Sequence, residues 1–134
     1  SRGRADRVGQ GQWHTRETMS TPAEFDFVDS QGVWLGDSWF RDWTWQEDAA
    51  AVDLTGRTIE FIVETAAGVA ELTLSTATSG VSVTDAAGGE FRVSITPTQS
   101  TALGIGQRCY RMRVTTGSDV RTLAVGRFAV LGNV

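Results

Sequence analysis

The residue types that could perform catalysis are few, and their positions do not suit it. The chain has a single histidine, His14, in a polar N-terminal stretch, and it contains no G-x-S-x-G motif. A general base needs a fixed geometry relative to its nucleophile. Glu60, Glu64 and Glu71 leave a paired-carboxylate glycosidase open, although Glu60 and Glu64 share the solvent-facing side of one predicted strand. We therefore expect no enzymatic activity.

Metal and phosphate binding are also disfavoured by the spacing of the residues. His14 and the only cysteine, Cys109, lie far apart in the sequence and form no zinc motif. No D-x-D-x-D-G calcium loop occurs, and the stretch Gly104-Ile105-Gly106 lacks the third glycine of a dinucleotide-binding loop. We expect neither a metal nor a cofactor, and we assign the aspartates to turns and to surface charge.

A cluster of tryptophans is the most distinctive local feature of the sequence. Trp34, Trp39, Trp43 and Trp45 fall within twelve residues. The last three share one parity, so a strand would carry them on one face. Such a cluster fits a hydrophobic core, an interface with another protein or a platform on which sugars stack. The sequence leaves these interpretations open, and it makes Trp34 and Trp39 candidate interface residues.

The charge of the chain is divided unevenly. Residues 1–23 hold four arginines against two acidic residues, a net charge of +2, whereas residues 24–134 hold eight arginines against fourteen acidic residues, a net charge of −6. An acidic body does not attract nucleic-acid phosphates, and no segment approaches the roughly 20 apolar residues of a membrane-spanning helix. We expect no nucleic-acid or membrane partner.

The N-terminal stretch is predicted to be a flexible arm over residues 1–23, because it is polar and has no periodicity. A basic arm on an acidic body suits docking onto a neighbouring acidic protein surface. A tryptophan in such an arm can anchor in a partner's pocket or fold back on its own domain. The candidate interface residues of the arm are Trp13, Arg2, Arg4, Arg7 and Arg16.

The elements expected after the arm are short strands separated by turns. Residues 57–64 alternate cleanly, with Ile59, Phe61 and Val63 facing inward. Several such segments at spacings of 8–12 residues are typical of a sandwich or barrel. Residues 24–134 are therefore predicted to form one antiparallel β-sandwich domain.

Four details of this domain follow from local patterns. The only predicted helix covers residues 98–103, with Thr98 as its N-cap. Residues 116–119 suit the turn of a hairpin between the last two strands. Tyr110 is expected to be a buried framework residue, and Gly126 is expected to mark a bulge or a close approach of the backbone.

A succession of short motifs runs from about residue 25 to the end of the chain. The motifs are Gly36-Asp37-Ser38, Asp53-Leu54-Thr55-Gly56-Arg57-Thr58, Phe91-Arg92-Val93-Ser94-Ile95-Thr96, Thr98-Gln99-Ser100-Thr101-Ala102-Leu103, Gly106 before Tyr110, and Thr122-Leu123-Ala124-Val125-Gly126-Arg127-Phe128-Ala129-Val130. In order and spacing they resemble the immunoglobulin-like β-sandwich domains of bacteriophage tail, neck and baseplate proteins, such as the N-terminal domain of the siphophage baseplate upper protein. The chain departs from this pattern at Arg108, where the family tends to have an aromatic residue, and at Arg111, where it often has an acidic one.

The resemblance implies an immunoglobulin-like fold and a structural role in a phage virion, with assembly in the host bacterial cytoplasm. Other virion proteins, and further copies of the chain in a ring or sleeve, would be its partners. A carbohydrate-binding module for attachment to the host surface is the alternative, motivated by the tryptophans. The sequence leaves open whether the protein belongs to the tail, the neck, the baseplate or the head decoration.

Overall fold

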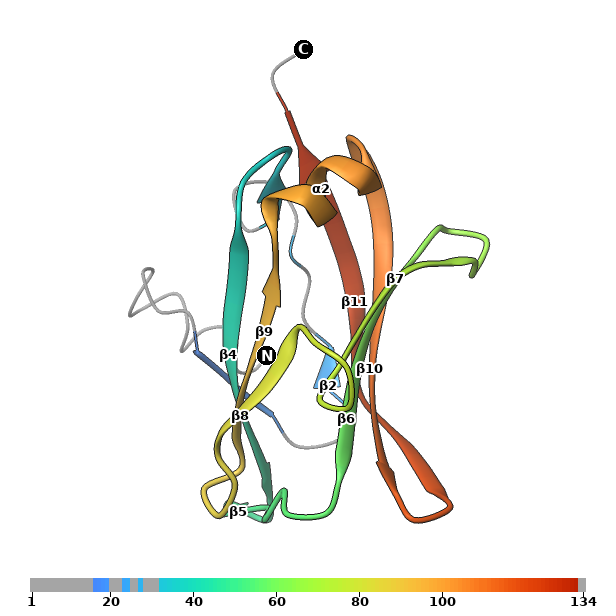
Figure 1. The fold of residues 1–134 in the computed structure, drawn as a ribbon. Coiled ribbons are helices and arrows are strands. Elements are labelled where there is room, and N and C mark those ends of the chain that lie inside the picture. The colour runs from blue at the N-terminus through green and yellow to red at the C-terminus, as the bar shows by residue number, and fades with distance from the viewer. Residues whose placement is uncertain (1–15, 20–22, 25–26, 28–31, 133–134) are drawn as a thin grey trace.

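The computed structural model describes residues 16–19, 23–24, 27 and 32–132 of the 134-residue chain. These residues form strands and one short helix (Figure 1). The elements are β1 (Arg16–Met19), β2 (Ala23–Glu24), β3 (Val33–Trp34), β4 (Trp39–Glu47), β5 (Ala50–Ala51), β6 (Thr58–Glu64), β7 (Ala70–Ser75), β8 (Val81–Asp85), β9 (Glu90–Ile95), α2 (Pro97–Leu103), β10 (Gly106–Thr116) and β11 (Asp119–Leu131).

The strands form two sheets that face each other as a sandwich (Figure 1). The first sheet has the order β1-β4-β9-β8, with β5 paired to β4, and the second has the order β2-β11-β10-β6-β7, with β3 paired to β11. The prediction of an all-β sandwich is confirmed.

The order of the strands is that of an immunoglobulin-like fold. Strands β4, β9 and β8 correspond to B, E and D of one immunoglobulin sheet, and strands β11, β10, β6 and β7 correspond to G, F, C and C′ of the other. These strands pair with their neighbours antiparallel. The N-terminal strands differ, because β1 runs parallel to β4, and β2 and β3 run parallel to β11.

The alternation read from the sequence places the core between the sheets. On β6, Ile59, Phe61 and Val63 are fully buried, and on β10, Tyr110 and Met112 are buried opposite them. Paired residues on the two strands point to the same face of the sheet, so the apolar sides of β6 and β10 form one continuous surface. The predicted burial of Tyr110 is confirmed, with 2% of its surface exposed.

Aromatic rings fill the centre of the sandwich. Phe27 lies edge-on to Trp39 and Trp43, at centroid distances of 5.5 and 5.8 Å, and it is also close to Tyr110. Trp39 in turn lies edge-on to Phe128 at 5.0 Å. Edge-to-face contacts of this kind add to the free energy gained by burying the rings. Phe27, which bridges to Phe128 beside β11, thus brings the N-terminal segment into the core.

The turn between β10 and β11 is the predicted hairpin. Thr116 pairs with Asp119, which leaves Gly117 and Ser118 as a two-residue loop. Gly117 has φ of 63°, a conformation that favours glycine and suits the twist of a hairpin. Of the two roles predicted for Gly126, the bulge is wrong, because Gly126 pairs regularly with Tyr110 and the register shifts between Met112 and Arg113 instead. The extra residue opposite that shift is Leu123, which is buried.

The helix begins earlier than predicted. Its N-cap is Thr96, whose side chain accepts a hydrogen bond from the backbone N–H of Gln99, while the Gln99 side chain accepts one from the backbone N–H of Thr96. This capping box, followed by Pro97 at the start of the helix, outweighs the cap expected at Thr98. Gly104 ends the helix, as the sequence suggested.

The N-terminal boundary also differs from the prediction. Residues 16–19, expected in the arm, pair with residues 42–45 of β4, and Ala23 pairs with Ala124. An edge strand such as β4 offers unpaired backbone groups, and pairing with them stabilises even a polar segment that has no hydrophobic periodicity. Part of the range 1–23 therefore belongs to the sandwich.

Candidate interaction surface

The predicted interface residues separate into three groups. Trp13, Arg2, Arg4 and Arg7 lie outside the described residues. Arg16 is in β1, at the edge of the first sheet. Trp34 is 45% exposed, whereas Trp39 is only 7% exposed and belongs to the core.

The tryptophan cluster is mainly core. Trp43 and Trp45 are buried like Trp39, because their shared parity turns all three toward the opposite sheet. Trp39 is therefore wrong as a surface candidate. Among the tryptophans that the structure describes, Trp34 alone is exposed. It lies at the end of β3 and pairs with Leu131 of β11. The described tryptophans therefore do not form an exposed row on which a sugar could stack.

A small apolar area surrounds Trp34 at the end of the sandwich near α2. Leu35 is 40% exposed, and its backbone N–H donates to the carbonyl of Leu131. Ile105 is 49% exposed, and its side chain lies against Gly132. These residues come from the turn after β3, the end of β11 and the turn before β10. They form a limited contact surface.

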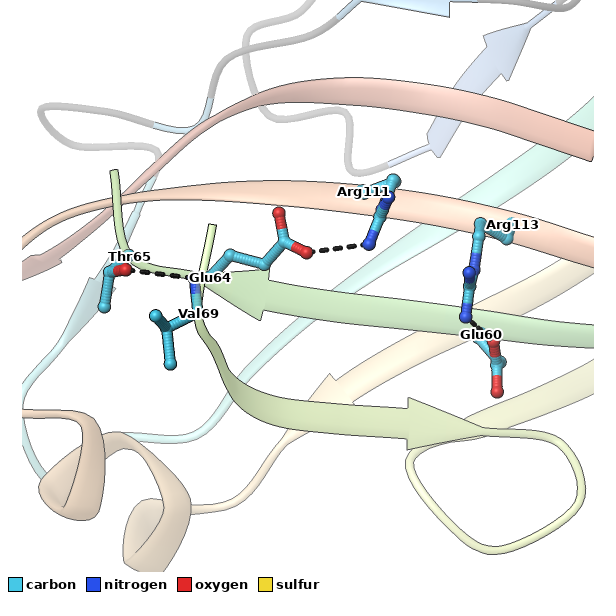
Figure 2. A network of polar contacts seen from close by, with 6 residues as sticks. All are labelled: Glu60, Glu64, Thr65, Val69, Arg111 and Arg113. Carbon is cyan, nitrogen blue, oxygen red and sulfur yellow. Dashed lines mark hydrogen bonds and ion pairs between the residues drawn. The ribbon is translucent and has the colours of Figure 1, made fainter. Parts of the chain in front are cut away.

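The outer face of the second sheet carries carboxylates that are each held by an arginine. Glu60 bonds Arg113 and Glu64 bonds Arg111, both at 2.8 Å, across the paired strands β6 and β10 (Figure 2). Glutamate pairs that act as acid and base need one group free to hold a proton and another to meet the substrate. Here both carboxylates are charge-compensated, which favours a structural role for them.

The third glutamate considered from the sequence links β7 to the helix. Glu71 forms an ion pair with Arg108, and the same guanidinium donates to the carbonyl of Leu103 in the last turn of α2. A cation is favourable at a helix C-terminus, where the carbonyl groups carry partial negative charge. Arg108 thus fixes the start of β7 relative to α2. It stands where the resemblance led us to expect an aromatic residue.

A hollow lies between α2 and β7, beside this ion pair. Its volume is about 270 Å³, and its lining residues are Glu71, Leu72, Gln99, Ala102 and Leu103. Small-molecule sites usually measure roughly 300–1,000 Å³ and enclose most of the ligand. This hollow is smaller, and its mixture of aliphatic walls and one carboxylate suits a single large side chain with a polar tip.

Strand β7 is an open edge of the second sheet. Among the described strands it pairs with β6 alone. Because Thr76 donates its backbone N–H to the carbonyl of Ile59, and bonded pairs alternate along antiparallel strands, the backbone of Thr73 points away from β6. The N–H of Ser75 points the same way and donates to Ser79 of its own turn. The exposed Thr73 thus presents a backbone donor and acceptor at the edge.

The open edge at β7 was not predicted from the sequence. The alternation in residues 69–76 predicted a strand, but nothing in it told which strands would be neighbours. The hollow depends on α2 lying over the start of β7, which is a long-range contact. The sequence of β7 contains no proline, which is one of the residues that often protect an edge strand.

Two aspartates, Asp53 and Asp85, cap turns, whereas Asp42 of β4 forms an ion pair with Arg92. The Asp53 carboxylate accepts the backbone N–H of Thr55 at 2.9 Å, and hydrogen bonds from Thr55 lower the pKa of Asp53 below its ordinary value of 3.8. Asp85 accepts the N–H of Gly88 in the turn before β9. Within the described parts of the chain, no group of three or more His, Cys, Asp or Glu side chains could hold a metal ion. No helix in these parts is long and apolar enough to cross a membrane.

Comparisons with known proteins do not assign a family. No family model matches the chain, and no curated protein matches it in sequence. Among solved structures, the N-terminal domain of phage TP901-1 ORF48 is similar with a TM-score of 0.49 and 12% identity, covering 90% of this chain and 98% of that domain. The N-terminal Ig1-2 module of the Drosophila receptor protein tyrosine phosphatase DLAR has a TM-score of 0.41 and 17% identity, and the match covers 76% of this chain and 44% of that module. At these scores neither likeness carries information on function.

Proposed function

We propose that this chain is a structural component of a bacteriophage virion that assembles with further copies of itself and with other virion proteins. The observation that carries the proposal is the open edge of β7, with the hollow beside it, in a sandwich whose glutamates on the second sheet are held by arginines. An unprotected edge is a ready template for pairing with another chain. The succession of motifs resembles phage tail, neck and baseplate domains, and this resemblance is the reason for proposing that the assembly is a virion.

The proposal includes the absence of enzymatic activity. Glu60, Glu64 and Glu71 are the carboxylates considered for glycoside hydrolysis, and each is bound to an arginine. Each ion pair occupies a carboxylate oxygen that a glycosidase would need to direct toward its substrate. These three residues are better suited to fixing β6, β7 and β10 in place.

A test of the virion role is to purify particles from an induced culture of the strain that carries this sequence. We expect the chain in the particle fraction at many copies per particle, and density for the sandwich in a symmetric ring or sleeve by cryo-electron microscopy. Recovery of the chain only from the particle-free fraction would contradict the proposal.

Carbohydrate binding is the second candidate function, and exposed Trp34 is the observation that favours it. A single aromatic ring can stack on one sugar, but most of the tryptophan cluster is committed to the core. Glycan-array binding that is lost in Trp34→Ala and kept in Trp34→Phe would support this alternative. If the unaltered chain, Trp34→Ala and Trp34→Phe all bind glycans equally, or none of them binds, carbohydrate binding through Trp34 is excluded.

A further inference from the structure

We propose that the edge of β7 and the hollow beside α2 form the acceptor site for residues 1–15 of a neighbouring copy. In this arrangement the neighbour's segment adds as a further strand on β7, and its Trp13 enters the hollow. The inference deepens the proposed function, on which it rests, by naming the contact that joins one copy to the next.

The backbone at the edge is suited to an added strand. Thr73 directs its N–H and carbonyl away from β6, as derived above from the bond between Thr76 and Ile59. Strand addition draws its affinity from such main-chain hydrogen bonds and its specificity from pockets for side chains. Residues 1–15 contain no proline, so each of their peptide groups can take part in pairing.

The hollow matches the one large aromatic side chain of the segment. Leu72, Ala102 and Leu103 supply aliphatic walls, and Glu71 supplies a carboxylate. A buried indole needs an acceptor for its N–H. One oxygen of Glu71 already bonds Arg108, and the other can accept this N–H. Trp13 is the only aromatic residue in residues 1–15 other than His14.

The charges of the two partners are complementary. Residues 1–15 contain three arginines and one aspartate, a net charge of +2, and residues 24–134 carry a net charge of −6. This difference favours encounter between the segment of one copy and the body of another. Its contribution is long-range, so it directs association and does not select the site.

The topology places β1, the strand that follows residues 1–15, and the acceptor site on opposite sides of one copy. β1 and β8 are the outer strands of the first sheet. β8 lies beside β7, since the chain bridges from Ser75 to Gly80 between them. β1, from which residues 1–15 lead off, is therefore at the side of the sandwich away from β7. A contact between unlike surfaces propagates from copy to copy and closes into a ring when the rotation allows.

The distance from Trp13 to β1 limits how the copies can lie. Trp13 lies three positions before Arg16, and an extended chain spans at most about 3.6 Å per residue, or roughly 11 Å in all. Trp13 can therefore reach only a hollow on a copy whose β7 side lies directly against the β1 side of the first. The inference requires tightly abutting sandwiches.

The test measures self-association of the full chain by native mass spectrometry and sedimentation over a range of concentrations. Thr73→Pro removes the outward N–H without touching the bonds to β6, and edge strands tolerate proline in this orientation. Thr73→Val keeps the N–H and the branched shape. We expect Thr73→Pro to raise the dissociation constant by roughly thirtyfold or more, as for loss of an interface hot spot of about 2 kcal/mol. Thr73→Val should stay within about threefold of the unaltered chain.

The hollow is tested separately. Ala102→Trp fills it from the exposed face of α2, and Thr101→Trp places the same side chain at a neighbouring exposed position of α2 that does not line the hollow. We expect Ala102→Trp and Trp13→Ala to weaken association to a similar degree, while Thr101→Trp and Trp13→Phe retain most of it. Circular dichroism and thermal unfolding check that each variant is folded, so a misfolded Thr73→Pro leaves the Ala102 and Trp13 variants to decide.

A mixing experiment tests the head-to-tail geometry. Trp13→Ala lacks a donor but keeps its acceptor, and Thr73→Pro lacks an acceptor but keeps its donor. Mixed together, they should form a heterodimer that grows no further, at a concentration at which each variant alone is monomeric. Unchanged association of Thr73→Pro and Ala102→Trp would overturn the inference, and so would an unaltered chain that is monomeric at all concentrations. The virion role is judged independently, by the presence of the chain in particles.

Discussion

At the scale of single residues, burial separates side chains that the sequence grouped together. Trp34 and Trp39 lie five residues apart in one aromatic cluster, yet 45% of Trp34 is exposed and 7% of Trp39. Trp39 contacts Phe27, Phe61 and Phe128, so its ring is an integral part of the core. The same residue type thus has different energetic weight at two nearby positions.

Replacing these two tryptophans tests that difference. Trp39→Ala should lower the free energy of unfolding by about 3–5 kcal/mol, the usual cost of deleting a buried aromatic side chain. Trp34→Ala should lower it by less than about 1 kcal/mol, since it removes a partly exposed ring. Urea denaturation followed by circular dichroism measures both. Comparable losses for the two variants would contradict the placement of Trp39 in the core.

Ser100 is a buried hydroxyl that the sequence did not single out. Its Oγ accepts the backbone N–H of Gly36 at 2.9 Å and lies 3.1 Å from the carbonyls of Asp37 and Pro97, to one of which it can donate. Ser100→Ala leaves the Gly36 N–H without this partner and should cost about 1–3 kcal/mol. Thr101→Ala, at an exposed neighbour on α2, is the control and should be near neutral. A neutral effect of Ser100→Ala in thermal unfolding would show that water replaces the hydroxyl.

Asp53 gives the stability a dependence on acid pH. Its pKa is lower in the folded protein than in the unfolded chain, because Thr55 donates hydrogen bonds to the carboxylate. The stabilisation is therefore fully present above the unfolded pKa near 3.8 and is lost as the pH falls through the folded pKa. Asp53→Asn should make the unfolding free energy less dependent on pH in the acid range. An unchanged slope in acid titrations of the variant would contradict this assignment.

At the scale of elements, the N-terminus of α2 is defined by one pair of residues, Thr96 and Gln99, that forms a capping box. Thr96 and Gln99 exchange hydrogen bonds between side chain and backbone, whereas Thr98 lies exposed in the first turn. The sequence suggested Thr98 because a threonine often precedes a helix. The pattern of threonine followed three residues later by glutamine at Thr96 was the more informative one.

The two threonines provide a matched test of the cap. Thr96→Ala should reduce the free energy of unfolding by about 1 kcal/mol, since the N–H of Gln99 loses its acceptor. Thr98→Ala should change it by less than about 0.5 kcal/mol. Thermal or urea unfolding of the two variants compares them directly. If Thr98→Ala lowers the free energy of unfolding more than Thr96→Ala does, Thr98 is the N-cap, as first predicted.

At the scale of the whole molecule, the N-terminal segment completes both sheets. β1 lines the first sheet at β4, β2 and β3 line the second at β11, and Phe27 fills the core between them. The domain therefore starts before residue 24, the boundary taken from composition. Residues 1–15, the donor segment of the proposal above, precede β1 in the chain.

Two truncations locate the boundary. Removing residues 1–15 keeps β1, β2 and β3, and should leave the unfolding free energy of the dilute monomer within about 0.5 kcal/mol. Removing residues 1–24 also deletes β1 and β2 and should cost roughly 2 kcal/mol or more, because several backbone hydrogen bonds contribute about 0.5–1.5 kcal/mol each. Urea denaturation measures both proteins. Equal stability of the two would place the boundary back near residue 24.

The sequence alone determined the class of fold and most of the strands. Alternation of apolar and polar residues has the period of a strand, and it identified the buried faces of β6 and β10 and the hairpin at Gly117 correctly. These features depend on neighbours a few residues away, so local patterns contain the information. The same holds for the turn aspartates, whose hydrogen bonds reach two or three residues along the chain.

Only the tertiary structure decided which residues are neighbours across the sandwich. The pairing of β1 with β4, the open edge at Thr73, the hollow between α2 and β7, and the burial of Ser100 against Gly36 all join segments far apart in sequence. Strand order is set by how the whole set of apolar faces can be buried at once, and no single segment carries that information. For the same reason the tryptophans divided between core and surface only when the sheets came together.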